Sequence, residues 1–266
     1  MEDKSMTDKI LTEKDGAIGW LIYNNPDMRN AVSIDMAEKA AAEIVRLGND
    51  DDIRVIVVKG AGGKSFVSGQ DISEFESLRS TPEKVAHFDK VTDDMYDGMR
   101  LCPKPTMAMI QGYCMGGGMA LACACDIRLC SEESIFAIPA GRLGIGYRTN
   151  FVRWVVEAVG PSVTKEILYT ARRYDATEAL QIGLVNRVLP NVDLEDYVAE
   201  YAATIAENAP LTARATKIVV NEVAKSFGEY DAELCAQVVE DCANSEDFKE
   251  GRRAFMEKRN PEFKGN

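Results

Sequence analysis

The sequence predicts a mixed α/β core over residues 1–195, followed by a helical C-terminal region over residues 196–266. The first 60 residues read as a strand, a helix and a strand, an order that favours a parallel sheet with crossover connections. From about residue 150 onward, apolar residues recur mainly at helical spacing and strand signals are few. The apolar faces of the tail exceed what one small core needs, which favours contact with a neighbouring subunit.

Short apolar runs predict the first strands. Gly19–Tyr23 is such a run, ended by the turn sequence Asn-Asn-Pro-Asp, and Arg54–Lys59 is another, closed by Gly-Ala-Gly-Gly. Between them, Ser33 has the character of an N-cap for an Ala-rich helix over residues 34–47. The sequence therefore predicts that a helix forms the crossover connection between these two parallel strands.

The middle of the chain alternates between helix and strand signals. A helix starts at Pro82, which suits the first helical position, and ends before Pro103. Its apolar stripe consists of Val85, Phe88, Val91, Met95 and Met99. Further elements follow in order: a strand over Thr106–Ile110, a short helix over 119–124, and strands near Ile127–Cys130 and Ser134–Ile138.

The tail contains helices separated by proline. Pro190 ends one segment, Asp193 is placed to cap the next helix, and Pro210 precedes another over about 211–225. Two more helices are expected near residues 229–243 and 246–258. Leu234, Val238 and Phe248 are among the apolar residues of these helices.

Charge and hydropathy exclude several partners. The chain has 31 basic and 43 acidic residues, a net charge of −12, without a long Lys/Arg run, which argues against nucleic acid and anionic lipid. No stretch approaches the about 18 apolar residues that span a bilayer. The beginning of the sequence is acidic and polar, unlike a signal or transit peptide. We therefore expect a cytoplasmic protein with no membrane partner.

The cysteines predict reduced core residues and not a metal site. Their number is odd, the Cys-x-Cys spacing in the middle is unusual for zinc, and His87 is the single histidine. The seven are Cys102, Cys114, Cys123, Cys125, Cys130, Cys235 and Cys242. We expect no metal.

Two glycine-containing turns stand out as candidates for chemistry. Ser68–Ile72 follows a predicted strand, and Gly116–Gly118 leads into an apolar helix. Glycine lets a backbone approach a ligand closely, and the free N–H groups of a helix start suit a developing negative charge. Neither turn matches the phosphate-cradling loop or the dinucleotide fingerprint. The alternative for the three glycines is close packing of the helix.

The order of these and other motifs resembles the crotonase (enoyl-CoA hydratase/isomerase) superfamily across almost the whole chain. The residues that carry the resemblance are Asn25-Pro26, Arg29-Asn30-Ala31, Ser68-Gly69-Gln70-Asp71-Ile72, Lys104-Pro105-Thr106, Gln111-Gly112-Tyr113 with Gly116-Gly117-Gly118, Cys125-Asp126-Ile127, Leu143-Gly144-Ile145, Ala176–Leu180 with Gly183-Leu184-Val185, and Glu257-Lys258-Arg259 with Phe263.

The resemblance implies a spiral of ββα units with a helical C-terminal region that assembles trimers or hexamers. It implies an acyl-CoA thioester as the substrate, without a separate cofactor because coenzyme A is part of the substrate. The thioester oxygen would lie between the backbone N–H groups of Gln70 and Gly117. The residues implied to contact the acyl-CoA are Arg29, Ala31, Ser68, Gln70, Asp71, Ile72, Tyr113, Gly117, Pro139, Ala140 and Lys258. For Arg29 and Lys258 the alternative is solvated surface charge.

The hydratases of this superfamily use two glutamates, and the matching positions here are Ala120 and Ala140. Two carboxylates on either side of water make chemical sense because one accepts a proton and the other donates one. Alanine does neither. Glu132 and Glu133 lie nearby in sequence but are assigned to the surface. A reaction that needs only an enolate trap, such as decarboxylation of a malonyl-type thioester, would survive this change.

Residues 140–147 and 245–261 resemble segments of methylmalonyl-CoA decarboxylase, a member of this superfamily. The resemblance implies that Tyr147 orients a substrate carboxylate, although Gln70 stands where that enzyme has histidine. Two alternatives stay open: a hydratase or isomerase whose acid and base come from elsewhere, such as His87 or Tyr147, and an acyl-CoA-binding subunit without turnover. Tyr147 has the alternative of a packed core tyrosine, and Arg148 and His87 that of exposed surface residues.

Overall fold

The computed structural model describes residues 8–78, 80–142, 146–225 and 231–266. Its main sheet has 6 strands in the order β1-β2-β3-β5-β7-β10. Their bounds are β1 Ile10–Asp15, β2 Ile18–Tyr23, β3 Val55–Gly60, β5 Thr106–Ile110, β7 Ile127–Ser131 and β10 Arg187–Leu189. β1 pairs antiparallel with β2, and the other neighbours pair in parallel. The predicted parallel sheet with crossovers is confirmed.

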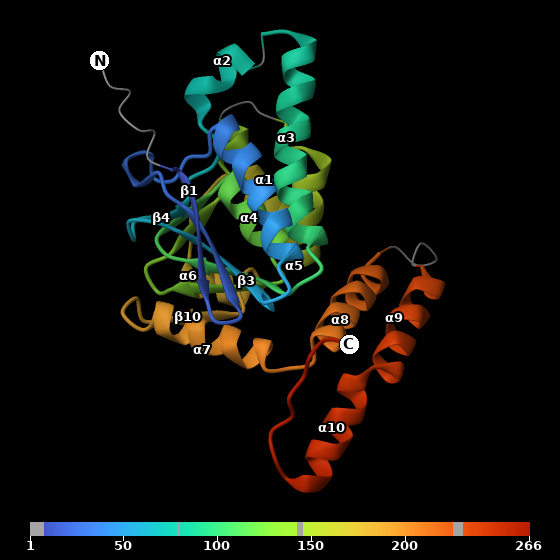
Figure 1. Cartoon of the computed structure of the whole chain (residues 1–266). Coiled ribbons are helices and arrows are strands. Elements are labelled where there is room, and N and C mark those ends of the chain that lie inside the picture. The colour runs from blue at the N-terminus through green and yellow to red at the C-terminus, as the bar shows by residue number, and fades with distance from the viewer. Residues whose placement is uncertain (1–7, 79, 143–145, 226–230) are drawn as a thin grey trace, which may run out of the picture.

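A second sheet lies beside the first and has the order β4-β6-β8-β9. Its strands are β4 Ser65–Val67, β6 Tyr113–Met115, β8 Ile135–Ala137 and β9 Tyr174–Asp175. The chain visits the main sheet, then the second sheet, then a helix, three times in succession. The helices of these repeats are α3 Pro82–Leu101, α4 Gly117–Ala124 and α5 Thr149–Thr170. This is the predicted spiral of ββα units (Figure 1).

Helix α1 (Ile34–Asn49) follows β2 and packs on α3. The Ser33 side chain accepts a hydrogen bond from the Met36 amide at 3.3 Å, as expected of an N-cap. Met36, Ala40, Ile44 and Leu47 are buried, and their spacing places them on one face of the helix. This face belongs to the larger core, which also contains the apolar side of α3 and most of α4.

The opposite face of the main sheet is covered by α7 (Leu194–Ala206). Its buried residues Leu194, Val198 and Ala202 join a second core with Trp20 and Val57 of the sheet. Strand side chains alternate between faces, so β2 is buried along its whole length because both faces are covered. Helix α7, which begins at the predicted boundary near residue 195 and continues into the predicted tail, thus packs on the α/β core.

The remaining tail helices are α8 Pro210–Val223, α9 Ala232–Asn244 and α10 Glu246–Glu257. They extend away from the two sheets as a separate helical arm (Figure 1). Short elements complete the described chain: η1 Pro26–Met28, η2 Ile72–Glu74, α2 Phe75–Leu78, η3 Pro139–Arg142 and α6 Ala176–Gln181. Among all the residues that the structure describes, no helix is both long and apolar enough to cross a membrane.

One expectation about strands is wrong. From about residue 150 onward the sequence predicts helices with few strand signals, yet β9 and β10 lie in this part of the chain, and β10 forms an edge of the main sheet by pairing with β7. Strand β10 has 3 residues, and its register is fixed by the pairing of Arg187, Val188 and Leu189 with β7. Periodicity cannot reveal so short a strand, because hydrogen bonding to its neighbour holds it in place.

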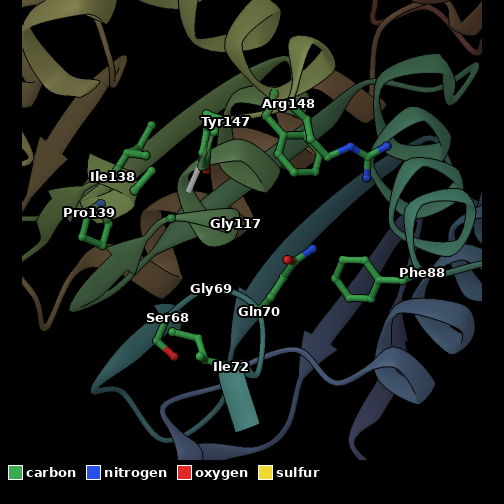
Figure 2. Close-up of a pocket in the computed structure, with 14 residues that line it drawn as sticks. Ser68, Gly69, Gln70, Ile72, Phe88, Gly117, Ile138, Pro139, Tyr147 and Arg148 are labelled. Carbon is green, nitrogen blue, oxygen red and sulfur yellow. The ribbon is translucent and has the colours of Figure 1, made fainter. Parts of the chain in front are cut away.

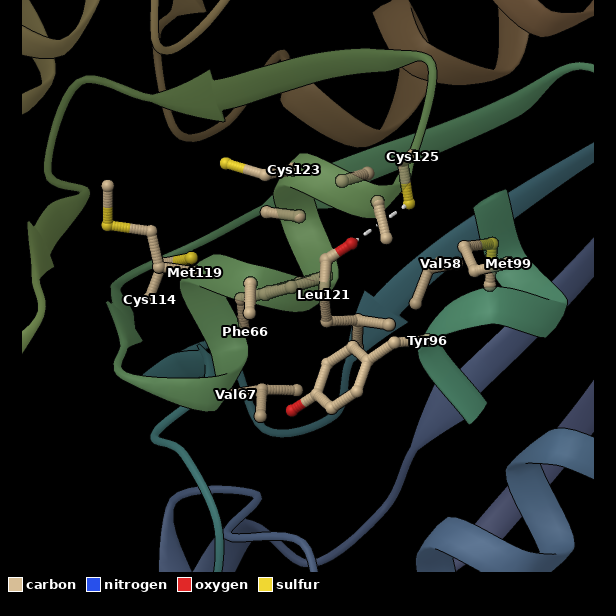
Figure 3. Close-up of a cluster of buried hydrophobic side chains, with 14 of the residues drawn as sticks. Val58, Phe66, Val67, Tyr96, Met99, Cys114, Met119, Leu121, Cys123 and Cys125 are labelled. Carbon is tan, nitrogen blue, oxygen red and sulfur yellow. Dashed lines mark hydrogen bonds between the residues drawn. The ribbon is translucent and has the colours of Figure 1, made fainter. Parts of the chain in front are cut away.

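The described cysteines are free thiols, as expected. Cys114, Cys123 and Cys125 are buried at α4 and its flanking segments (Figure 3), and Cys130 is buried in β7. Burial raises the pKa of the Cys123 thiol to about 11 and that of Cys130 to about 12. Among the residues that the structure places, no group of three or more His, Cys, Asp or Glu side chains is arranged to hold a metal ion.

Candidate active site

A cavity of about 110 Å³ lies between the loop after β4, the start of α4 and the segment leading into α5 (Figure 2). Most of its lining is apolar, as in small-molecule sites with a few fixed polar groups. The residues that line it are Ser68, Gly69, Gln70, Ile72, Phe88, Gly116, Gly117, Ile138, Pro139, Ala140, Gly146, Tyr147, Arg148 and Phe151.

The loop after β4 directs the Gln70 amide towards this cavity. The Val32 amide donates to the Gly69 carbonyl, and the Asp71 amide donates to the Val32 carbonyl, both at 2.9 Å. These bonds flank Gln70 in a parallel bridge, so its own N–H points away from Val32. Gly69 permits the bend because its φ of +113° is accessible mainly to glycine.

The start of α4 brings a second amide to the same place. Gly116 has φ 50° and ψ −116°, and its N–H donates to the Ala137 carbonyl at 2.8 Å. A methyl group built on Gly117 would lie 3.5 Å from the Gln70 nitrogen, and one on Gly69 would lie 3.6 Å from the Gly117 nitrogen. The Gln70 and Gly117 amides thus border one narrow gap.

Within the described chain, neither the Gln70 amide nor the Gly117 amide donates a hydrogen bond. The Gly117 amide belongs to the first turn of α4, where the helix leaves its N–H groups unpaired and the helix dipole is positive. Two free donors beside an apolar cavity can hold an oxygen that becomes negatively charged. Such a pair of donors is the arrangement that an oxyanion hole requires.

Gly118 has a different role from Gly117. A methyl group on Gly118 would lie 2.0 Å from the Val67 carbonyl oxygen, so only glycine allows α4 to approach β4 this closely. The alternative of close helix packing therefore describes Gly118. The Gly116–Gly118 sequence combines a bend, a free donor and a packing contact in three successive residues.

Two side-chain groups in the cavity wall have no hydrogen-bond partner among the described residues. They are the amide nitrogen Nε2 of Gln70 and the hydroxyl of Tyr147, and both are buried. Figure 2 shows the two side chains entering the space from opposite sides. Burial raises the pKa of Tyr147 well above its ordinary value of 10.0, so the hydroxyl keeps its proton. Buried polar groups are rarely unpaired, which suggests that a ligand supplies the partner.

The wall formed by Ile138, Pro139 and Ala140 is apolar. Ala140 lines the cavity, whereas Ala120 is buried in the larger core behind it. No carboxylate is among the described lining residues, since the ionisable side chains there are Tyr147 and Arg148. Glu132 and Glu133 are exposed on the turn before β8.

The predicted site residues divide into two groups. The cavity brings together Ser68, Gln70, Ile72, Gly117, Pro139, Ala140 and Tyr147. Asp71 lies next to them but its carboxylate accepts from the Ser73 amide at 3.0 Å and the Ser73 hydroxyl at 2.6 Å. This contact caps η2, and Asp71 is not part of the described lining.

Arg29, Ala31 and Tyr113 lie outside this cavity. The Arg29 guanidinium lies 5.2 Å from the centre of the Tyr113 ring, within cation–π distance. The Ala31 carbonyl accepts from the Asn25 side chain at 3.2 Å. Lys258 follows α10 in the helical arm, so the structure does not bring it to the cavity of its own chain (Figure 1).

His87 and Arg148 differ in position. His87 is exposed, and its Nε2 lies 3.3 Å from a Glu38 carboxylate oxygen on α1. Arg148 lines the cavity, but its guanidinium pairs with Asp93 and Asp89 of α3 and donates to the Thr92 hydroxyl at 2.9 Å. The guanidinium charge is thus engaged by carboxylates on α3.

Sequence reasoning missed several lining residues. Phe88 was identified only as part of the apolar stripe of α3, and Phe151 carried no signal beyond its apolar character. The Tyr147 and Phe151 rings meet edge to face with centres 5.7 Å apart, which closes this end of the cavity. Residues 143–145 of the predicted motif lie outside the described residues.

Comparisons with known proteins agree with this geometry. The family model for enoyl-CoA hydratase/isomerase matches residues 13–266. Short-chain-enoyl-CoA hydratase of Clostridium acetobutylicum is 30% identical over 250 residues, covering 94% of this chain and 95% of that protein. Crotonyl-CoA hydratase of Syntrophomonas wolfei is 30% identical over 256 residues, covering 96% of this chain and 98% of that protein.

Solved structures give the same result. The crystal structure of an enoyl-CoA hydratase/carnithine racemase from Magnetospirillum magneticum is similar with a TM-score of 0.91 and 34% identity, covering 98% of this chain and 97% of that chain. An enoyl-CoA hydratase from Bacillus anthracis has a TM-score of 0.91 at 28% identity, covering 97% and 100% of the two chains. The chain therefore belongs to the enoyl-CoA hydratase/isomerase family, within the crotonase superfamily.

Proposed function

We propose that this protein decarboxylates a malonyl-type acyl-CoA thioester by holding the thioester oxygen between the Gln70 and Gly117 amides. One observation carries the proposal: two backbone donors and two side-chain donors that have no partner among the described residues share a cavity whose described lining contains no carboxylate. The family acts on acyl-CoA thioesters, and the local resemblance to methylmalonyl-CoA decarboxylase supports the reaction class.

The reaction needs an electron sink more than an acid–base pair. The bond between the α-carbon and the carboxylate carbon breaks, CO2 leaves, and the electron pair moves into the thioester to form an enolate. Negative charge then develops on the thioester oxygen, where an oxyanion-hole donor contributes about 3–4 kcal/mol. A proton from solvent completes the product at the α-carbon.

The side chains of Gln70 and Tyr147 are the proposed partners of the substrate carboxylate. Both groups donate hydrogen bonds, and a carboxylate accepts several. Held in this way, the carboxylate would lie against the apolar wall of Ile138 and Ala140. Charge is less stable there than in water, so loss of neutral CO2 is favoured.

The second candidate function is hydration or isomerisation of an enoyl-CoA. The observation in its favour is that relatives at 30% identity are named hydratases. Tyr147 would then have to supply the proton transfer, because Ala120 and Ala140 cannot. His87 is a weaker candidate, since it faces Glu38 and is outside the described lining.

Incubation with a panel of acyl-CoA thioesters separates the candidates. Mass spectrometry of methylmalonyl-, ethylmalonyl- and crotonyl-CoA reports loss of CO2, gain of water or no change for each compound. We expect loss of CO2 from a malonyl-type thioester. Gain of water by crotonyl-CoA would favour the hydratase, and binding without any mass change would favour an acyl-CoA-binding subunit.

We also propose that the chain assembles into a trimer or a dimer of trimers through its helical arm. The arm extends from the core (Figure 1), and its residues Val220, Val223 and Phe248 are exposed in the single chain. Such an apolar surface is more stable when covered. Light scattering at micromolar protein should give a trimeric or hexameric mass, whereas a monomeric mass would contradict the assembly.

A further inference from the structure

We propose that Tyr96 is a positioning residue that fixes the direction of the Gly117 donor. Tyr96 lies on α3, about two turns after the cavity-lining Phe88, and its hydroxyl donates to the Gly117 carbonyl at 3.0 Å. This inference rests on the proposed oxyanion hole and goes beyond it, because Tyr96 does not itself line the cavity.

The glycine turn has one anchor in the hydrogen bond from the Gly116 amide to the Ala137 carbonyl, and Tyr96 supplies a second at the Gly117 carbonyl. Gly116, Gly117 and Gly118 follow one another, and glycine samples a wider range of φ and ψ than any other residue. A shift of φ or ψ at Gly117 would change where its N–H points relative to the Gln70 amide. A hydrogen bond to the carbonyl of the same residue restricts that freedom.

Tyr96 is well suited to be the anchor because it is itself immobilised. Its ring is buried, with its centre 4.5 Å from that of Phe151 in an edge contact and 5.6 Å from that of Trp154. Figure 3 shows the Tyr96 ring packed beside Leu121 and Val67. A rotamer change would disrupt this packing, so the hydroxyl oxygen has a fixed position.

The same hydroxyl also limits the size of residue 117. A methyl group on Gly117 would lie 2.7 Å from the Tyr96 oxygen, well inside van der Waals contact. The Tyr96 hydroxyl therefore has two effects on Gly117: it donates a hydrogen bond to the Gly117 carbonyl, and it occupies the space that a Cβ would need. Burial raises the pKa of Tyr96, and the hydroxyl stays protonated and able to donate at all ordinary pH values.

The experiment compares Tyr96→Phe with Tyr23→Phe. Tyr23 is also fully buried, and its hydroxyl contacts the Met95 sulfur at 3.3 Å instead of the glycine turn. Each variant loses one buried hydroxyl, so a purely structural effect should be similar in both. The readouts are the thermal midpoint, kcat and KM for the accepted thioester, and the isotope-edited infrared stretch of the carbonyl of a bound, unreactive acyl-CoA.

In the wild type we expect the bound carbonyl stretch to be lowered relative to the thioester in water. Tyr96→Phe should lose part of that lowering and about tenfold in kcat with KM nearly unchanged, whereas Tyr23→Phe should keep both. Replacing Tyr96 with fluorotyrosine preserves the hydroxyl in a similar ring, and it should restore the carbonyl shift and kcat.

Two contrary results have different meanings. A wild-type carbonyl stretch equal to that in water would overturn the oxyanion hole, and this inference with it. A normal wild-type shift that Tyr96→Phe retains in full, with kcat within twofold of Tyr23→Phe, would overturn only the role of Tyr96. If Tyr96→Phe does not fold, Tyr96→Met, which fills the site without a hydroxyl donor, takes its place, and a retained or lost carbonyl shift has the same meaning there.

Discussion

The two walls of the cavity differ in what their backbone and side chains offer. One wall, formed by the Ser68–Ile72 loop and the start of α4, presents free amide donors fixed by the Val32 bridge and the Ala137 carbonyl. The other wall, formed by Ile138–Ala140, is apolar. Under the proposed function, the comparison teaches that carbonyl activation and proton transfer are separable in this fold, because the first depends on backbone geometry and the second on side chains.

The largest expected effect tests the apolar wall. Hydration of crotonyl-CoA should be negligible, since a positioned acid or base contributes about 10²–10⁴-fold and both glutamate positions are alanine. Following the decrease of enoyl absorbance measures this directly, and a glutamate-containing family hydratase serves as the positive control. Rapid hydration would show that another group transfers protons, and the two walls would no longer differ in function.

The next effect tests the wall that carries the amide donors, formed by the Ser68–Ile72 loop and the start of α4. Gly117→Val should lower turnover by about 10²–10³-fold, the loss typical of one oxyanion donor, because the side chain collides with Tyr96 and shifts the turn. Gly98→Ala on α3 is the matched control, since a methyl group there meets Ile44 at an ordinary 3.6 Å. Circular dichroism would test whether the Gly117→Val and Gly98→Ala proteins are folded. Full turnover in a folded Gly117→Val protein would exclude Gly117 from the site.

A smaller effect is expected at Tyr147, which lines the same cavity as the two walls. Tyr147→Phe should slow decarboxylation by about tenfold or more, because a hydrogen bond to a charged group contributes about 1.5–3 kcal/mol. Crotonyl-CoA binding, which involves no substrate carboxylate, should change little. Tyr174→Phe on β9, outside the cavity lining, provides a control of similar size. Equal loss for both thioesters would instead indicate a packing role for Tyr147.

The smallest effect concerns pH. Because burial raises the pKa of Tyr147, its protonated form persists through ordinary pH values and is lost only as pH rises through the raised pKa. Between about pH 7 and 9.5 this group should therefore leave the decarboxylation rate within about twofold. Rate profiles of wild type and Tyr147→Phe test this, with protein stability monitored at each pH. A wild-type fall in this range that Tyr147→Phe abolishes would contradict the buried, protonated hydroxyl.

The sequence was most informative where local chemistry decides the structure. Ser33 caps α1 and Pro82 starts α3 as predicted, and Thr106–Ile110 is a strand with the predicted bounds. In contrast, β4 has only 3 residues and β1 contains the polar run Thr-Glu-Lys-Asp. Their strand conformation comes from pairing with β6 and β2, and a pattern along the chain does not contain that information.

The site shows the same division. The family resemblance carried by the Ser68–Ile72 and Gly116–Gly118 motifs implied the two amide donors, and the structure places both amides at the cavity. That the Tyr147 hydroxyl and the Gln70 side-chain amide have no hydrogen-bond partner among the described residues was not predictable, because it depends on which groups the fold leaves out of reach. Phe151 joins the site for a similar reason: α5 returns to the cavity only in the folded chain.

The thiols buried around α4 offer a way to measure local opening of the native protein. Thiolates are the nucleophiles that attack alkylating reagents, and burial both shields Cys114, Cys123 and Cys130 and raises their pKa values. In the native protein these cysteines should therefore react slowly. Labelling of one of these cysteines would require a local opening of the α4 region, which also presents the Gly117 amide. The labelling rate at each cysteine therefore measures how often this region opens.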